Sequence, residues 1–163
     1  MSKYGQSPRK EKFLNNLPTT AIDSGDLASR CKFNFSYFHH DQEFASNFSD
    51  LDKDSLSELL DKLKEYSKFS LQHWARMRIG GGRCVLEVYG KFPDRSEFKH
   101  PPHVPHDALW ARFRIEGAVR LVGFVLPNEI SGKSATNCEG IYCCNTFYIV
   151  FIDTQHKFYL TKK

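Results

Sequence analysis

The chain has 163 residues, 40% of them apolar and 14% aromatic, and a net charge of +4. This length suits one domain, because single cores of about 100 to 200 residues are usual and leave no room here for a second full domain. The composition excludes disorder of the whole chain, and the 14 Phe and 7 Tyr favour a sheet, on whose pleated surface aromatic rings pack well.

The charge is unevenly distributed along the chain. Residues 41–61 are mainly acidic, whereas residues 68–120 carry ten Lys and Arg against five Asp and Glu. The second region suits an anionic partner such as nucleic acid, whose phosphates dominate the affinity of such complexes. A mixed solvent-exposed surface accounts for the same counts, so both interpretations stay open on charge alone.

No segment has the character of a membrane span or a secretion signal. The longest nearly uncharged apolar stretch, residues 145–152, is far shorter than the roughly 20 residues that a spanning helix needs, and the N-terminus is polar. The cysteines are odd in number and irregularly spaced, unlike those of a small disulfide-rich secreted domain. They are Cys31, Cys84, Cys138, Cys143 and Cys144. We therefore expect a cytoplasmic protein with reduced thiols and no membrane partner.

The N-terminal region is expected to stand apart from the domain. Residues 1–30 contain prolines, glycines and scattered charges without a sustained period, which predicts a flexible arm followed by a single α+β domain over residues 31–163. Residues 32–38 then alternate and place Phe33 and Phe35 on one face, which predicts a first strand.

One long helix is predicted to begin at Ser55. Ser55 and Glu58 form a capping-box pattern, and large apolar residues then recur at steps of three and four as far as Trp74. The glycines at 80–82 are expected to end this helix. A glycine triplet can also cradle phosphate, but here it follows a helix instead of preceding one.

The second half of the chain is predicted to form strands. Residues 99–106 contain three prolines and are expected to form a loop. The predicted strands cover residues 84–92, 109–116, 119–126, 146–152 and 156–160, and the third and fourth of these are apolar at nearly every position, as in central strands. We therefore predict an α+β fold with a mainly antiparallel sheet of about five strands and one long helix packed on one face.

Two arginines share one face of a predicted strand. Because side chains alternate along a strand, Trp110, Arg112 and Arg114 point to one side and the apolar residues between them to the other. A rigid strand would thus present two guanidinium groups together.

A third arginine follows after a short turn. Arg120 is the single charge within residues 118–126, and it needs an acceptor or a ligand because burying an unpaired charge is costly. A two-residue loop at 116–117 would put Arg120 on the opposite face from Arg114. A three-residue loop at 116–118 would set the two arginines opposite each other, and the sequence allows both.

The end of the chain offers further polar groups. His156, Lys157 and Tyr159 could supply a proton acceptor or donor, a phosphate contact and a ring that stacks on a base, or they could be ordinary residues of an exposed edge strand. The pattern W-A-R-F-R-x-x-G-x-x-R-L-V-G-F from Trp110, followed by an apolar strand and D-x-x-H-K-F-Y, resembles the end of the RelE/ParE toxin superfamily.

The resemblance implies a metal-independent endoribonuclease that acts on RNA, at the ribosome in that superfamily, within a toxin–antitoxin or phage-defence system. It implies catalytic roles for Arg120, His156 and Tyr159, and an antitoxin protein as a partner. Nucleic-acid contacts are expected from three further residues, Arg112, Arg114 and Lys157. The alternative function is a noncatalytic protein- or nucleic-acid-binding module of a bacterial defence or regulatory assembly.

No metal or cofactor is expected. His100, His103 and His106 are evenly spaced, but extended backbone between prolines separates successive imidazoles by roughly 10 Å, too far for one ion without a tight turn. Cys143 and Cys144 have no base fixed beside them in the sequence, so structural thiols are favoured over nucleophiles.

Overall fold

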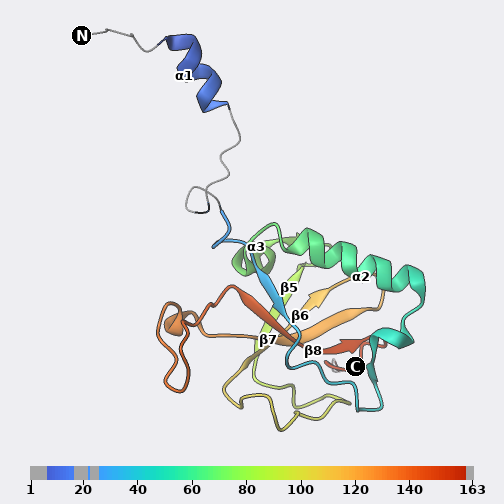
Figure 1. Ribbon diagram of the computed structural model, residues 1–163. Helices are drawn as coiled ribbons and strands as arrows, with labels where there is room; N and C mark the ends of the chain where they lie inside the picture. Colours follow the sequence, from blue (N-terminus) through green and yellow to red (C-terminus); the bar gives the residue numbers. More distant parts are fainter. Residues whose placement is uncertain (1–6, 17–21, 23–25, 161–163) are drawn as a thin grey trace.

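A computed structural model describes residues 7–16, 22 and 26–160 (Figure 1). The helices of this part of the chain are α1 Pro8–Asn15, α2 Lys53–Tyr66 and α3 Leu71–Arg76, with short 3-10 turns at Phe48–Asp50 and Asn128–Ile130. The strands are β1 Lys32–Asn34, β2 Ala45–Ser46, β3 Arg78–Ile79, β4 Arg83–Cys84, β5 Leu86–Gly90, β6 Leu109–Arg114, β7 Arg120–Val125 and β8 Thr146–Asp153. The α+β class is confirmed. Of the predicted arm, residues 1–6, 17–21 and 23–25 lie outside the described residues, and α1 has no buried side chain.

The main sheet is mixed, with six strands where about five mainly antiparallel ones were predicted. Its order is β1-β8-β7-β6-β5, and β2 pairs with the far end of β8. The β1–β8 pair is parallel and the other pairs are antiparallel. A parallel pair requires a long crossover connection, which the whole intervening chain supplies. This long-range pairing leaves no signal in the local pattern of β1.

The predicted single long helix is two helices. The Asp52 side chain caps α2 by accepting a hydrogen bond from Ser55 N at 2.8 Å, so the cap lies before the predicted start. At the other end the Tyr66 carbonyl accepts from the Trp74 indole at 2.7 Å and from the Cys31 thiol at 3.0 Å. These tertiary bonds satisfy the end of α2. No helix in the described ranges has the length and apolar character needed to cross a bilayer.

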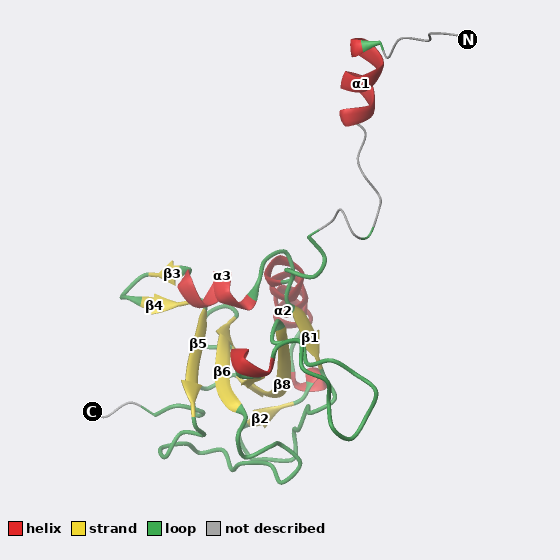
Figure 2. Ribbon diagram, turned by 90° about the vertical axis from the view of Figure 1, so that its left-hand side faces the viewer, coloured by secondary structure: helices red, strands yellow, loops and turns green. Residues whose placement is uncertain are grey.

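The glycine triplet forms a turn between strands and does not end a helix. Gly81 and Gly82 have φ angles of 73° and 77°, a left-handed conformation that glycine adopts at little cost. They connect β3 to β4, whose short hairpin lies beside α3 (Figure 2). The hairpin brings Arg83 next to the main sheet.

The predicted last strand, residues 156–160, is irregular. The Asp153 carboxylate accepts hydrogen bonds from the backbone N–H groups of Gln155, Lys157 and Phe158 at 3.0, 3.1 and 2.9 Å. These bonds fold the chain into a turn directly after β8. The same N–H groups are therefore not free to join a strand ladder.

Both faces of the sheet are covered, so β7 and β8 are central strands as predicted, and every residue of β7 is buried. Helices α2 and α3 pack on one face around Leu59, Trp74 and Phe113. The proline-containing loop that precedes β6 and the segment after β8 cover the other face around Trp110 and Phe158 (Figure 1). The predicted loop at 99–106 contains no strand or helix, as expected from its prolines.

Replacing Gly123 with Ala should destabilise the fold by about 3 kcal/mol, because an overpacked buried site must shift its backbone or strain its neighbours. Gly123 lies where the β7–β8 register shifts, and an added Cβ would overlap the Tyr148 carbonyl oxygen and lie 2.9 Å from a ring carbon of Phe147. Urea unfolding measures the change. Gly140→Ala is the matched control, since its Cβ would meet no atom within 4 Å. Equal stability of both variants would contradict the close contact between the backbones of β7 and β8 at Gly123.

Candidate functional site

The β6–β7 hairpin places three arginines on one face of the sheet. Ile115 N donates to Val119 O at 3.2 Å, and Arg114 stands opposite Arg120 in the register. The loop is therefore the three-residue one, 116–118. Arg112, two residues before Arg114 on β6, shares this face, which we call the arginine face.

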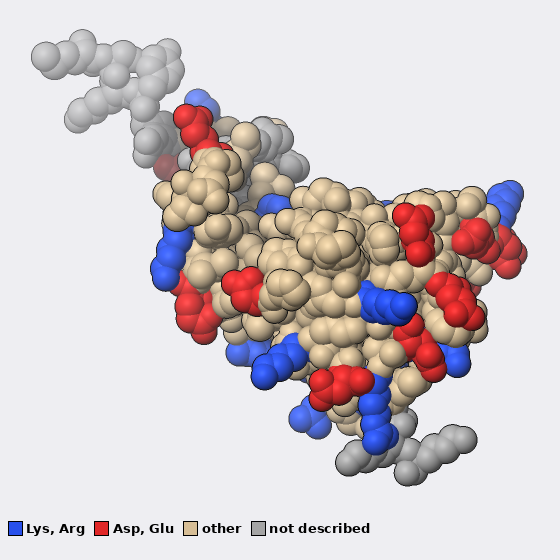
Figure 3. All heavy atoms as spheres, turned by 90° about the horizontal axis from the view of Figure 1, so that it is seen from below, with Lys and Arg blue, Asp and Glu red and all other residues tan. Residues whose placement is uncertain are grey.

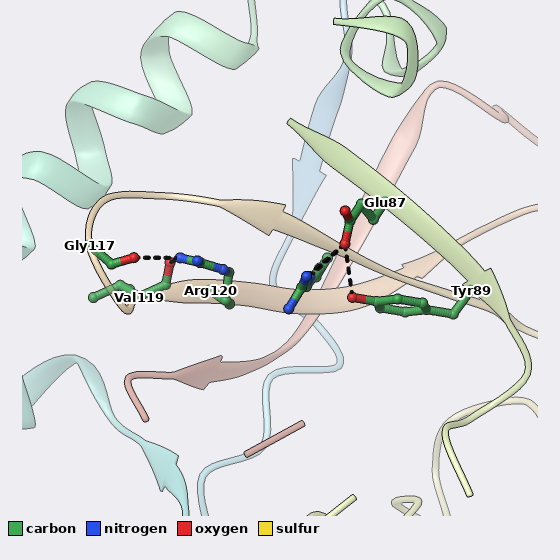
Figure 4. A network of polar contacts seen from close by, with 6 residues as sticks. Glu87, Tyr89, Gly117, Val119 and Arg120 are labelled. Carbon is green, nitrogen blue, oxygen red and sulfur yellow. Dashed lines mark hydrogen bonds and ion pairs between the residues drawn. The ribbon is translucent and has the colours of Figure 1, made fainter. Parts of the chain in front are cut away.

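Arg120 is the most deeply buried member of the arginine face, with 4% of its surface exposed. Its Nη1 donates to the carbonyl oxygens of Gly117 and Val119 at 2.9 and 2.8 Å (Figure 4). The guanidinium points toward the turn and away from Glu87. Burial, followed by the charges of Arg112 and Arg114, lowers its pKa to about 10, so it stays protonated at neutral pH.

Arg112 is held in an ion pair with β5. Its Nε and Nη2 donate to one carboxylate oxygen of Glu87 at 3.1 and 2.6 Å. The Tyr89 hydroxyl donates to the same oxygen at 3.2 Å (Figure 4). Burial raises the pKa of Tyr89, so its phenol remains a neutral donor. The network fixes the direction of Arg112 and leaves part of its charge compensated.

Arg114 is the arginine of this face whose guanidinium has no side-chain or backbone acceptor within the described residues. It is half-buried at the mouth of the hairpin. A free, partly exposed cation beside two bonded ones is suited to bind an anion from solution.

His156 lies in the turn built by Asp153, near enough to Arg120 for the charge of the guanidinium to act on its ring. Asp153 is 1% exposed and stands opposite Arg120 in the register, and its three backbone hydrogen bonds hold the turn. His156 has a φ of 55°, uncommon for a residue with a Cβ. Desolvation and the positive charge of Arg120 lower the pKa of His156, and Asp153 opposes the shift. The ring is therefore kept neutral near pH 7.

Tyr159 contacts the arginine network, whereas Lys157 points to another aromatic ring. The Tyr159 ring stacks on Tyr89 with centroids 4.7 Å apart and planes 4° apart, and 43% of Tyr159 is exposed. Tyr159 thus joins the Arg112 network through Tyr89. The Lys157 ammonium lies 5.2 Å from the centre of the Phe44 ring, so its described contact is not with the arginines. Of the six predicted site residues, the three arginines share one face and Tyr159 reaches Arg112 through Tyr89, whereas His156 is related to them through charge alone and Lys157 lies over Phe44.

Two hollows adjoin the arginine face. The one that touches all three arginines measures about 10 Å³, room for about one water molecule. It shares Arg83, Glu87 and Arg112 with a larger cavity of about 570 Å³, which Tyr89 and Tyr159 also line. An anion larger than water would therefore bind in the larger cavity, in reach of Arg83 and Arg112.

Arg83 and Glu87 were missed at the sequence level. Arg83 directly follows the glycine turn that was interpreted as the end of a helix, so nothing in that interpretation brought it to the sheet. Glu87 and Tyr89 alternate along β5 and could have been placed on one face. Their partner Arg112 depended on the β5–β6 register.

The surface around the arginine face is not uniformly basic. Seen from the side opposite α2, Lys and Arg are interspersed with Asp and Glu, and neither sign gathers into one large patch (Figure 3). Affinity for a polyanion would then come from the cavities beside the arginines more than from a positive electrostatic potential over the whole surface.

The histidines of the proline-containing loop form stacked or edge-on pairs. His100 and His106 stack with centroids 4.9 Å apart, while His103 meets His39 at 5.5 Å. Within the described ranges, no three His, Cys, Asp or Glu side chains are grouped so as to hold a metal ion. These imidazoles pack with aromatic rings in the part of the chain that covers the sheet.

The chain matches no protein-family model, no curated protein and no solved structure.

Replacing Asp153 with Ala should lower the free energy of unfolding by about 3 kcal/mol, because three backbone N–H groups, one in a buried and two in part-buried hydrogen bonds, lose a charged acceptor. Urea unfolding measures the loss. Amide hydrogen exchange should also become faster at Lys157 and Phe158, whose N–H groups Asp153 holds. Asp107→Ala serves as the control, since Asp107 is exposed in the loop before β6. Unchanged exchange at residues 157 and 158 would show that the carboxylate does not hold the turn.

Proposed function

We propose that the protein is a metal-independent endoribonuclease of the toxin type, acting at the arginine face. One observation carries the proposal: arginines of two paired strands lie on the same side of the sheet, and the turn after β8 brings His156 near enough for the charge of Arg120 to act on its ring. The resemblance of residues 110–124 and 153–159 to the RelE/ParE toxin superfamily supports the same reaction.

RNA would bind in the cavity of about 570 Å³ and extend from it along the arginine face toward His156, which lies outside the cavity lining. A phosphate group there would contact Arg83 and Arg112, and Arg114 would approach it from the hairpin, since its guanidinium carries no other described bond. Arg120 is too deeply buried to touch a phosphate in this arrangement. Its role would be to hold the turn and to add positive potential behind the bound phosphate.

His156 would act as the general base. Its neutral ring takes the proton of a ribose 2′-hydroxyl, the 2′-oxygen attacks the adjacent phosphorus, and the bond from phosphorus to the 5′-oxygen breaks. The leaving oxygen takes a proton from water, which reaches the open cavity. The products are a 2′,3′-cyclic phosphate and a 5′-hydroxyl end. The negative charge that develops on the phosphate oxygens is stabilised by the arginines.

Tyr159 would stack on a base of the bound RNA. Its ring is already parallel to Tyr89 and partly exposed, so a base can extend the stack at low ordering cost. Lys157 would contribute little, because its ammonium lies over Phe44.

A second candidate function is a noncatalytic nucleic-acid-binding module. It is favoured by the bonds that Arg112 and Arg120 already make to Glu87 and to turn carbonyls, since such bonds suit a structural role. The two candidates differ in whether bound RNA is cut.

The purified protein should cut single-stranded RNA in the presence of a chelator, and His156→Ala should slow cleavage by about a hundredfold or more while RNA affinity is kept. Gel analysis of labelled RNA measures the rate, and fluorescence anisotropy measures binding. His40→Ala is the control, an exposed histidine away from the arginine face. Expression in bacteria should arrest growth, and the arrest should be relieved by His156→Ala. RNA that is bound but left intact by the wild type would favour the noncatalytic module.

The imidazole of His156 should titrate below the ordinary histidine value of about 6.5, because desolvation and Arg120 disfavour its charged form. As the neutral ring is the base, kcat/KM should rise with pH and reach half its plateau below about pH 6.5. NMR titration of the ring protons, assigned with His156→Gln, measures the pKa independently of activity. A midpoint above that of an unstructured histidine peptide would contradict the described surroundings of the ring.

A further inference from the structure

A second cavity lies on the other side of Tyr159. It measures about 490 Å³ and is lined by the segment 91–95 together with Tyr159 and Leu160. Lys91 and Arg95 are its basic residues, both exposed, and neither forms an ion pair within the described part of the chain. One acid, Asp94, also lines it, so the cavity has a net positive lining.

The walls of this second cavity are tied to each other. Leu160 N donates to Arg95 O at 3.1 Å, and Glu97 N donates to Lys157 O at 3.0 Å. The Phe92 ring packs edge-on against Phe158 with centroids 5.4 Å apart. The cavity is therefore part of the folded structure and not a gap between independent loops.

Tyr159 is common to the second cavity and to the cavity of about 570 Å³ beside the arginine face, which we call the arginine cavity. Tyr89 lines the arginine cavity and not the second one, so Tyr159, which stacks on Tyr89, is the aromatic side chain that borders both cavities. A ligand that occupies both cavities must pass over the exposed part of Tyr159. The sequence of groups along this path is Arg83 and Arg112, then an aromatic ring, then Lys91 and Arg95.

The geometry points to one continuous groove for single-stranded RNA, with Lys91 and Arg95 binding a phosphate beyond the one at the arginine face. The inference rests on the proposed function for the nature of the ligand. Alternation of cations with an exposed ring matches a strand whose phosphates and bases alternate. A base stacked on Tyr159 must be unpaired, because bases inside a duplex are covered on both faces by their neighbours.

Binding of uncleavable 2′-O-methyl RNA to the full chain tests the groove by fluorescence anisotropy. The wild type should bind an octanucleotide at least about tenfold more tightly than a dinucleotide, because only the longer strand reaches the second cavity and extends the stack on Tyr159. Lys91→Ala/Arg95→Ala should bind the octanucleotide little more tightly than the dinucleotide. The slope of the logarithm of its binding constant against the logarithm of the salt concentration should become shallower by about 0.7, the value for the one phosphate contact that is lost.

Lys53→Ala/Lys64→Ala is the matched control, since it removes two exposed lysines of α2 on the opposite face of the sheet. It should keep the length preference. Octanucleotide affinity and salt dependence that are the same in the Lys91/Arg95 variant and in the wild type would overturn the groove and leave the proposed function standing. An octanucleotide duplex bound as tightly as the single strand would also overturn it. Failure of the wild type to bind either RNA would instead refute the proposed function itself.

Discussion

The register of the β6–β7 hairpin is the constraint on which the site depends. The three-residue loop sets Ile115 against Val119 and thereby Arg114 against Arg120. A slip of one residue would turn every side chain of β7 to the other face of the sheet, because strand side chains alternate. Arg120 would then enter the core beneath α2, and the apolar residues of β7 would lose their partners. The same register thus decides both the burial of β7 and the face on which the arginines lie.

The Asp153 turn completes what the hairpin begins. Asp153 stands opposite Arg120 in the register, but its carboxylate accepts hydrogen bonds from the backbone N–H groups of residues 155, 157 and 158. The negative charge lies close enough to oppose the depression of the Arg120 and His156 pKa values without forming an ion pair with either side chain. The arginine face therefore keeps a positive potential that favours an anion and that, after desolvation, lowers the pKa of His156.

Local rules predicted much of this structure. Alternation placed Arg112 and Arg114 on one face, prolines marked the loop at 99–106, and continuous apolar character marked β7 and β8 as central. The errors arose where contacts between residues far apart in the sequence determine where an element ends or how it pairs. Contacts from Cys31 and Trp74 to the Tyr66 carbonyl end α2, the parallel β1–β8 pair is set by chain topology, and the Asp153 carboxylate prevents a last strand. The candidate site was predicted incompletely for the same reason. Arg83 and Glu87 reach it through the β3–β4 and β5–β6 pairings, which the local sequence around each residue does not indicate.

The central claim is that the arginine face and His156 hold one ribose-phosphate unit between them. A crystal structure of the protein with an uncleavable 2′-deoxy substrate strand tests it most directly. The account predicts a phosphate within hydrogen-bonding distance of Arg83 or Arg112, with the His156 ring facing the 2′ carbon of the sugar whose 3′-oxygen carries that phosphate. A strand bound elsewhere, with the larger cavity beside the arginine face still filled by solvent, would contradict it.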